Sequence, residues 1–195
     1  MLDTVHLNPP TVLSALQEAT KAIGFTMESD PLTGLLLRTL ATAKPAGMFL
    51  ELGTGTGIGT AWIVDGMDST SKLITVDSNE RVTAITKRYL GNDPRITFST
   101  MDGAAFIESQ QPSSFDFIFA DMQPGKFRLL DETLQLLKPG GLYIIDDLLL
   151  QTSWEEAHAV RVYRLISTLE QRVDLHITKF NWSTGIIVAA KRSHL

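Results

Sequence analysis

Short apolar runs alternate with amphipathic segments through most of this chain. The strand-like runs lie at 48–52, 72–76, 95–98, 115–120 and 141–145. Helix-like segments fall between them, at 58–65, 79–90, 103–110 and 127–137. Alternation of this kind predicts βαβ units with right-handed crossovers and a parallel sheet. Because the last two runs are mostly apolar rather than alternating, we expect strands that are buried on both faces.

The two ends of the chain depart from this alternation. Residues 11–23 follow two prolines and predict a helix, and Asp30-Pro31 opens a second helix. Residues 155–170 predict a long helix near the other end. The chain closes with two strand-like runs, 173–180 and 185–190. Two adjacent strands with a short link can only pair antiparallel, so we expect a C-terminal hairpin.

These elements predict a single α/β domain over residues 1–195. Its sheet is expected to be doubly wound and Rossmann-like, mostly parallel with a C-terminal antiparallel hairpin, and covered by helices on both faces. Residues 1–44 supply two extra N-terminal helices, and residues 45–195 supply the sheet and the hairpin. A chain of 195 residues suits one domain with a substantial core.

Composition excludes several classes of function. The net charge of −5 gives no basic footprint, so nucleic acid is not an expected partner. The chain has no cysteine, which excludes disulfides and thiolate metal sites and fits a reducing cytoplasm. No apolar run approaches the ~20 residues that a membrane span needs. We therefore expect a cytoplasmic protein without a membrane partner.

A glycine-rich segment, Glu-Leu-Gly-Thr-Gly-Thr-Gly at 51–57, joins the first predicted strand to its helix. Glycine at Gly53, Gly55 and Gly57 permits a tight turn and a close approach of a ligand to the backbone. The turn leads to a helix N-terminus, where free N–H groups point outward. About 20 residues further on, Asp77 ends the second strand, where an acid can accept two hydrogen bonds from ribose hydroxyls.

The spacing of these residues selects one class of nucleotide. The dinucleotide fingerprint would need glycine where the chain has Ile58 or Thr60, and a P-loop would need a lysine beside this turn. A nicotinamide-dependent oxidoreductase is therefore a remote alternative. The carboxylate of Glu51 would repel a pyrophosphate and suits a cationic ligand. The pattern resembles motif I of the class I S-adenosylmethionine-dependent methyltransferases.

This resemblance implies S-adenosylmethionine as the cofactor. In the family the glycine loop contacts the methionine part, and the acid that closes the second strand holds the ribose. Asp102 is the candidate for the adenine amine, with Met101 on the ring face, and it also suits the N-cap of helix 103–110. The expected cofactor-binding residues are Glu51, Gly53, Thr54, Gly55, Gly57, Asp77, Ser78, Met101, Asp102, Gly103 and Asp121.

Carboxylates also follow the fourth and fifth predicted strands, at Asp121, Asp146 and Asp147. Open α/β sheets bind ligands at the carboxyl ends of their strands. The three residues resemble the Asp and the Asp-Asn pair of small-molecule O-methyltransferases of the catechol and caffeoyl-CoA type. In that family these residues bind a divalent cation that holds two vicinal hydroxyls of the acceptor. The resemblance thus implies Mg²⁺, a hard cation that prefers oxygen ligands, at Asp121, Asp146 and Asp147.

Two departures from the family pattern concern catalysis. The family's Asn is Asp147 here, which adds negative charge. The lysine that the family commonly places three residues after the first metal ligand, as the general base, is Pro124 here. The nearest amine belongs to Lys126, which is carried into the site by a Pro-Gly bend or else is a solvated side chain starting helix 127–137. Asp121 and Lys126 are therefore the candidate catalytic residues.

The sequence as a whole predicts methyl transfer from S-adenosylmethionine to a small-molecule acceptor, expected at an oxygen atom. The alternative is a catalytically silent protein of the same fold that binds S-adenosylmethionine or S-adenosylhomocysteine. A homodimer stays open as an assembly. Aromatic and methionine side chains are candidates for the walls of the acceptor site, namely Met27, Phe127, Trp154, Tyr163 and Trp182.

Overall fold

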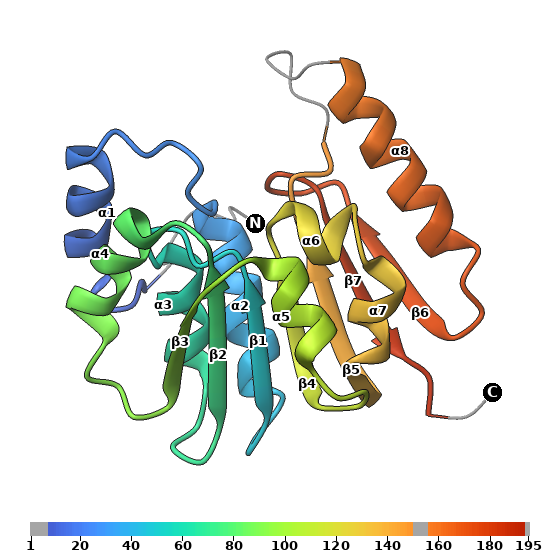
Figure 1. Ribbon diagram of the computed structural model, residues 1–195, viewed down its shortest axis with the longest axis horizontal. Helices are drawn as coiled ribbons and strands as arrows, with labels where there is room; N and C mark the ends of the chain where they lie inside the picture. The colour runs from blue at the N-terminus through green and yellow to red at the C-terminus, as the bar shows by residue number, and fades with distance from the viewer. Residues whose placement is uncertain (1–7, 150–155, 194–195) are drawn as a thin grey trace.

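The computed structural model of the protein describes residues 8–149 and 156–193. Its centre is a seven-stranded sheet with the strand order β3-β2-β1-β4-β5-β7-β6 (Figure 1). The strands are β1 (Met48–Leu52), β2 (Lys72–Asp77), β3 (Ile96–Thr100), β4 (Phe115–Ala120), β5 (Leu137–Ile145), β6 (Leu175–Phe180) and β7 (Ile186–Lys191). Strands β1 to β5 are parallel, and β7 pairs antiparallel with both β5 and β6. The predicted sheet and its C-terminal hairpin are confirmed.

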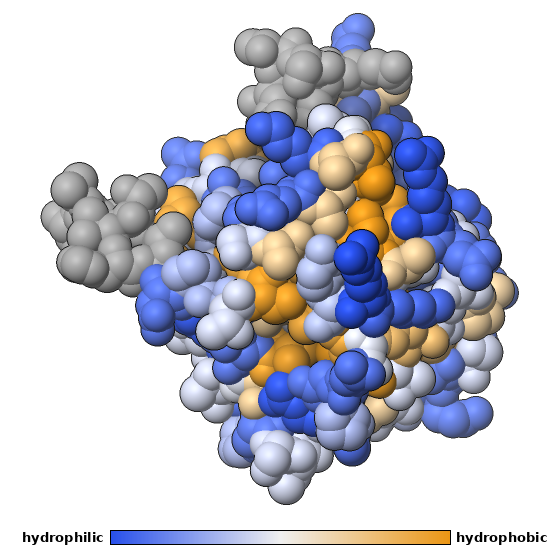
Figure 2. All heavy atoms as spheres, turned by 90° about the vertical axis from the view of Figure 1, so that its left-hand side faces the viewer, coloured by the Kyte–Doolittle hydropathy of each residue, from blue (hydrophilic) through white to orange (hydrophobic). Residues whose placement is uncertain are grey.

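Helices cover both faces of this sheet, as predicted. They are α1 (Leu13–Ala22), α2 (Pro31–Thr42), α3 (Ile58–Gly66), α4 (Glu80–Leu90), α5 (Gly103–Ser109), α6 (Gln123–Lys126), α7 (Leu130–Gln135) and α8 (Glu156–Glu170). Helices α5, α7 and α8 pack on one face and α2 and α3 on the other, so that each face has its own apolar core. A third cluster joins α1 to α3 around the buried Trp62. Apolar side chains show between polar ones on the surface around α1 and α4 (Figure 2).

The central strands are buried on both faces because their side chains alternate between the two cores. On β1, Leu50 and Leu52 belong to the core under α5 and α7, and Phe49 belongs to the core under α2 and α3. Phe117 of β4 lies beside Phe49, with ring centroids 5.1 Å apart. Burial of large apolar groups on both sides is the main source of stability for such a sheet.

Two predicted elements differ from the structure. The helix expected at 127–137 is the shorter α7, and a separate short helix, α6, precedes that range, because Gly125 and Leu129 both have a left-handed backbone, with φ of 90° and 56°. The strand expected at 141–145 begins already at Leu137, and its pairing with β4 shifts register on the way. Gly140, with φ of 75°, permits that irregular start.

The fold brings the carboxyl ends of β1, β2, β4 and β5 to one edge of the sheet, the upper edge in Figure 1. The candidate acids are distributed along that edge. Asp77 ends β2, Asp121 follows β4, and Asp146 and Asp147 follow β5. None of the helices in the described ranges combines the length and the apolar character needed to cross a membrane.

Candidate functional site

The glycine-rich loop between β1 and α3 has the backbone that only glycine adopts easily. Gly53, Gly55 and Gly57 have φ of 107°, 50° and 92°. A Cβ atom on Gly53 would lie 2.7 Å from the carbonyl oxygen of Asp121, and one on Gly57 would lie 2.5 Å from Cγ2 of Thr86. Both positions therefore require glycine for space as well as for conformation. The predicted turn is confirmed, and it touches the segment that follows β4.

Asp77 fixes the shape of this loop. Its Oδ2 atom accepts a hydrogen bond from the Gly55 N–H at 2.9 Å, and its Oδ1 atom accepts one from the Asn79 N–H at 2.8 Å. The side chain is half-buried, and Ser78 next to it is exposed. Each carboxylate oxygen can accept more than one hydrogen bond, so Asp77 retains capacity for ligand hydroxyls.

Glu51 lies buried beneath the loop. Its Oε2 atom accepts hydrogen bonds from the hydroxyls of Thr60 and Thr75, at 2.5 and 2.6 Å. Thr54 is also buried, with its hydroxyl 2.6 Å from that of Thr75, so its side chain supports the loop from inside. Burial raises the pKa of Glu51 to about 7, although the two threonine hydroxyls act in the opposite direction.

The second carboxylate oxygen of Glu51 is the feature that suits a cationic cofactor. Oε1 is buried and has no hydrogen-bond partner in the part of the chain that the structure describes. A Cβ atom on Gly59 would lie 2.9 Å from Oε1 and 3.2 Å from Oγ of Ser29, so glycine keeps this space open. An unpaired buried carboxylate is costly unless a cationic or hydrogen-bonding group meets it. The loop therefore fits a ligand with a positively charged group.

Asp102 has the capping role expected from the sequence. Its Oδ1 atom accepts hydrogen bonds from the backbone N–H groups of Ala104 and Ala105, at 2.9 and 3.0 Å. Met101 is 37% exposed beside it. A Cβ atom on Gly103 would lie 2.8 Å from Sδ of Met122, so a second methionine reaches this place. Met122 was not among the residues expected here from the sequence, although its position next to Asp121 was an available signal.

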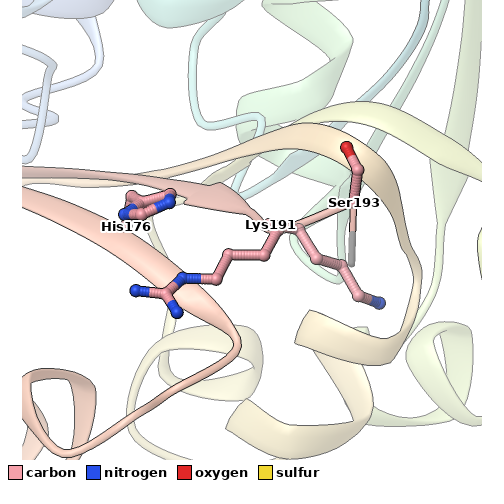
Figure 3. A pocket seen from close by; sticks show the side chains of 4 residues that line it. His176, Lys191 and Ser193 are labelled. Carbon is pink, nitrogen blue, oxygen red and sulfur yellow. The ribbon is translucent and has the colours of Figure 1, made fainter. Parts of the chain in front are cut away.

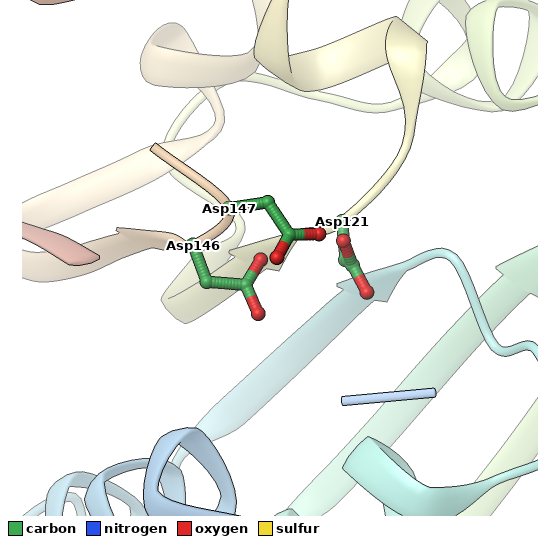
Figure 4. A group of neighbouring side chains, drawn as sticks. All are labelled: Asp121, Asp146 and Asp147. Atoms are coloured by element: carbon green, nitrogen blue, oxygen red, sulfur yellow. The ribbon is translucent and has the colours of Figure 1, made fainter. Parts of the chain in front are cut away.

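The three aspartates beyond β4 and β5 converge (Figure 4). Carboxylate oxygens of Asp121, Asp146 and Asp147 lie within 4.8 Å of one another. Burial, and next the charge of Asp146, raise the pKa of Asp121 well above its ordinary range. Burial also raises the pKa of Asp146. Neighbouring carboxylates in a low-dielectric site disfavour one another's ionisation. A positively charged group nearby would stabilise their ionised forms.

Lys126 supplies one positive charge to this cluster. Its side chain is buried, and its Nζ atom lies 3.8 Å from Oδ1 of Asp146. The bend before it is packed from below, because a Cβ atom on Gly125 would lie 2.4 Å from Cδ1 of Leu52. The Tyr143 hydroxyl donates a 2.6 Å hydrogen bond to the Gly125 carbonyl. The alternative of a solvated lysine is therefore wrong, and the Pro-Gly bend does bring Lys126 to the acids.

An aromatic side chain, Phe127, lies next to this lysine. Its ring centroid is 5.7 Å from the Lys126 Nζ atom, 5.5 Å from the ring of His158 and 5.8 Å from the guanidinium of Arg161. Burial, and next the charge of Arg161, lower the pKa of His158. Helix α8 thus contributes to the surroundings of the carboxylates.

The other candidate wall residues have different environments. Met27 and Tyr163 are 77% and 61% exposed, and Trp182 packs against the apolar core under α2 and α3. Trp154 lies outside the described residues. Of the four candidates within the described residues, Phe127 is the one that the structure places beside the candidate catalytic residues.

The carboxylate cluster also fits a divalent cation. Oδ1 of Asp146 is buried and lacks a hydrogen-bond partner within the described ranges, and all three ligand candidates offer hard oxygen atoms. Three carboxylates and one ammonium leave net negative charge when the acids are ionised. Oxygen donors of this kind suit Mg²⁺.

A basic hollow elsewhere on the molecule is separate from this site. His176, Lys191, Arg192 and Ser193 line it (Figure 3). Lys191 ends β7 and pairs with Leu175 at the start of β6, whereas the aspartates follow Ile145, which pairs with Ile187 near the other end of β7. The Lys191 Nζ atom donates hydrogen bonds to the carbonyls of Leu134 and Leu137, where its charge favours the C-terminal end of α7.

The part of the chain that forms the central strands and the candidate site matches a known protein family. Residues 50–148 match the family described as methyltransferase domain. The chain belongs to this methyltransferase family. The matched segment begins in β1 and ends just after Asp147, so it contains the glycine loop, Asp77 and the carboxylate cluster.

The curated relatives of this chain are distant in sequence. A protein of Mycolicibacterium vanbaalenii, provisionally assigned as an O-methyltransferase, is 28% identical over 144 residues, which cover 71% of this chain and 63% of that protein. A Mycobacterium protein with the same provisional assignment is 29% identical over 120 residues, or 59% of this chain and 54% of the relative. The matches thus span less than two thirds of the relatives' length.

Solved methyltransferase structures share the fold over nearly the whole chain. The O-methyltransferase TomG of Streptomyces achromogenes, in complex with S-adenosylmethionine, aligns with a TM-score of 0.83 and 19% identity over 98% of this chain and 94% of TomG. An O-methyltransferase from Bacillus cereus, in complex with S-adenosylhomocysteine, aligns with a TM-score of 0.82 and 19% identity, covering 96% and 94%. These two alignments show that this chain has the same fold as the solved methyltransferases.

Proposed function

We propose that this protein transfers a methyl group from S-adenosylmethionine to an oxygen atom of a small-molecule acceptor. The observation that carries the proposal is the junction of the glycine loop with the carboxylate cluster at Asp121. The backbone of Asp121 lies against Gly53, and its N–H donates a 2.8 Å hydrogen bond to the Leu52 carbonyl. A cofactor on the loop and an acceptor at the aspartates would therefore be neighbours, as methyl transfer requires.

The cofactor is assigned to the glycine-rich loop because the carboxylates there complement its positive charge and its hydroxyls. Glu51 offers its unpaired Oε1 atom to the ammonium of the methionine part, and Asp77 offers its remaining hydrogen-bonding capacity to the ribose hydroxyls. Asp102, with Met101 and Met122 near it, is assigned to the adenine. The S-adenosylmethionine in TomG and the S-adenosylhomocysteine in the Bacillus cereus protein support this choice of cofactor.

Proton removal from the acceptor is assigned to Lys126 and Asp121. Methyl transfer breaks the carbon–sulfur bond of the sulfonium and forms a carbon–oxygen bond, and the acceptor hydroxyl must give up its proton. Lys126, whose Nζ atom lies 3.8 Å from Asp146, would hold the remaining oxyanion as an ammonium, or would accept the proton as an amine after losing its own. Without a bound metal, Asp121 is the second candidate base, because burial and the charge of Asp146 raise its pKa toward the range in which a carboxylate accepts protons readily.

We further propose that Asp121, Asp146 and Asp147 hold a divalent cation, Mg²⁺. When bound, such a cation would make hydroxyls of the acceptor more acidic and would favour acceptors with two vicinal hydroxyls. Lys126 and the aspartates would then orient the acceptor and keep its oxygen directed toward the cofactor loop. The cluster geometry and the oxygen of Asp146 that has no hydrogen-bond partner among the described residues support this assignment.

A turnover assay tests the proposal. The protein is mixed with S-adenosylmethionine and a panel of catechols and hydroxycinnamates, with Mg²⁺ or with EDTA, and formation of S-adenosylhomocysteine is followed. Turnover with Mg²⁺ and its loss in EDTA are expected. Binding of S-adenosylhomocysteine without turnover of any acceptor would instead favour the catalytically silent protein. A cytoplasmic location and a homodimer remain expectations, and sedimentation of the purified chain tests the latter.

A further inference from the structure

An apolar pocket of about 170 Å³ lies between α8 and the β6–β7 hairpin. The described part of its wall is almost entirely apolar, with Lys179 and Asn181 as its polar members. The apolar side chains that matter here are Leu148, Leu149, Ile166, Phe180 and Ile187. A cavity of about 150 Å³ lined by similar side chains is large enough to bind benzene. The pocket thus has room for one aromatic ring or a short alkyl chain.

One backbone junction links this pocket to the carboxylate cluster. Leu148 and Leu149 donate hydrogen bonds from their N–H groups to the Thr184 carbonyl, at 3.0 and 2.8 Å. The Asp147 N–H donates to Oγ1 of the same Thr184 at 3.2 Å. A Cβ atom on Gly185 would lie 2.5 Å from the Leu149 nitrogen, so the two segments touch through their backbones. The segment that carries Asp147 therefore continues directly into the pocket wall.

The chemistry of the wall favours a neutral apolar occupant. Leu149 and Phe180 are 38% and 37% exposed, so two large apolar side chains face solvent at one pocket. Covering such side chains removes apolar surface from water, which favours binding. The charge of Lys179 is already paired with Glu170. An anionic group would have to compete with that ion pair, whereas a hydrocarbon group would not.

We propose that this pocket binds an apolar substituent of the methyl acceptor, an aryl ring or an alkyl chain of about two to four carbons. The hydroxyl that receives the methyl group lies at the carboxylate cluster, and the substituent extends past Asp147 into the pocket. This inference rests on the proposed methyltransferase function. The acceptors are accordingly vicinal diols that carry a hydrocarbon group, and the pocket discriminates among them.

Binding of a probe without hydroxyl groups tests the pocket by itself. The 195-residue protein with labelled isoleucine δ1 methyl groups is titrated with ethylbenzene and followed by NMR. The signals of Ile166 and Ile187 should move, and that of Ile63, in the core on the other face of the sheet, should not. Leu149→Trp should fill the pocket and abolish both shifts, and Ile166→Phe should abolish the shift of Ile187. Val160→Trp introduces the same side chain on an exposed part of α8 and should leave both shifts unchanged.

A substrate series tests whether the pocket serves the acceptor. KM is measured for catechol and for 4-methyl-, 4-ethyl- and 4-propylcatechol. KM should fall by roughly two- to fourfold per added carbon while kcat changes little, because each buried methylene adds a similar favourable increment. In Leu149→Trp the dependence should vanish, with catechol itself still turned over.

Distinct results would overturn the inference. If ethylbenzene does not move the methyl signals of Ile166 and Ile187, the pocket is not a binding site for apolar groups. A flat KM series with good turnover of catechol removes it from the acceptor site. If no catechol is turned over but ethylbenzene binds in a manner sensitive to Leu149→Trp, the proposed acceptor class fails while the pocket stands.

Discussion

The Nζ atom of Lys126 lies 3.8 Å from Oδ1 of Asp146, and both side chains are buried. Oδ1 has no hydrogen-bond partner in the described residues, so the ammonium is the nearest balancing charge that the structure gives it. A divalent cation held by Asp121, Asp146 and Asp147 would be drawn to the same oxygens. Lys126 and the proposed cation would therefore oppose each other's binding.

Replacement of Lys126 should separate its effect on cation affinity from its effect on turnover. In Lys126→Met, affinity for Mn²⁺ as a probe should rise roughly tenfold, because a like charge a few ångströms away costs one to several kcal/mol at an effective dielectric constant of ~20. Turnover should fall by about 10²- to 10⁴-fold, the usual contribution of a proton-transfer group. Calorimetry gives the first quantity and an S-adenosylhomocysteine assay the second.

Lys138→Met is the matched control, since Lys138 pairs with Asp116 at the opposite end of β4 and β5. It should change neither quantity appreciably. Weaker Mn²⁺ binding in Lys126→Met, or turnover equal to that of the control, would contradict the assignment of Lys126.

The bend that delivers Lys126 can be tested at Gly125. Gly125→Ala introduces a Cβ atom into left-handed backbone at φ 90° and 2.4 Å from Leu52. Gly140→Ala introduces the same strain at φ 75° with no atom within 4 Å. Gly140→Ala should lower the free energy of unfolding by ~1 kcal/mol, and Gly125→Ala by roughly 2–4 kcal/mol, since overpacking adds to it.

The two alanine variants should also differ in function. Gly125→Ala displaces Lys126 and should lower turnover, while affinity for S-adenosylhomocysteine is retained. Urea denaturation and calorimetry provide the measurements. Equal losses of stability and turnover in both variants would show that the packing of the bend on Leu52 has no special importance.

Asp77 should contribute strongly to cofactor affinity. Asp77→Ala removes an acceptor for the ribose hydroxyls and the hydrogen bond that Asp77 accepts from the Gly55 N–H. It should weaken S-adenosylhomocysteine binding by roughly 1.5–3 kcal/mol. Glu80→Ala, at an exposed position nearby, should have little effect. Unchanged affinity in Asp77→Ala would mean that the ribose is held elsewhere. Calorimetric binding of NAD by the wild type, without binding of S-adenosylmethionine, would remove the whole cofactor assignment.

Glu51 should make the stability of the ligand-free protein depend on pH. Its folded-state pKa of about 7 exceeds its ordinary 4.5, so its contribution to stability is fully present below pH 4.5 and is lost as pH rises through 7. The free energy of unfolding of the wild type, relative to Glu51→Gln, should fall by about 3 kcal/mol between pH 4.5 and 8. Urea denaturation across this range measures it. Glu108→Gln, on the exposed side of α5, should show no such trend, and a constant difference for Glu51→Gln would refute the shift.

The fold was predictable because local signals and topology agree. The short link between 173–180 and 185–190 allows only an antiparallel hairpin, and β6 and β7 form it. Asp30 and Asp102 were readable as helix caps since each bonds to N–H groups two or three residues away.

The site was less predictable where contacts between residues distant in sequence determine the position of a side chain. Leu52 and Tyr143 hold the Gly125 bend, so the sequence left the place of Lys126 open and misread the helix at 127–137. Glu51 was expected at the cofactor, but its burial depends on Thr60 and Thr75, which belong to other elements. No local pattern reveals those partners.

The central claim is that methyl transfer to oxygen occurs at the carboxylate cluster beside the cofactor loop. The most direct measurement is mass spectrometry of products formed from S-adenosylmethionine with a deuterated methyl group and a 4-alkylcatechol. The wild type should yield the labelled O-methyl product. Asp146→Asn should lower its rate at least about 100-fold, as loss of a preorganised electrostatic group does, while S-adenosylhomocysteine still binds. Asp116→Asn, at the other end of the sheet, should retain the activity. A product without the labelled methyl on oxygen, or full activity of Asp146→Asn, would contradict the claim.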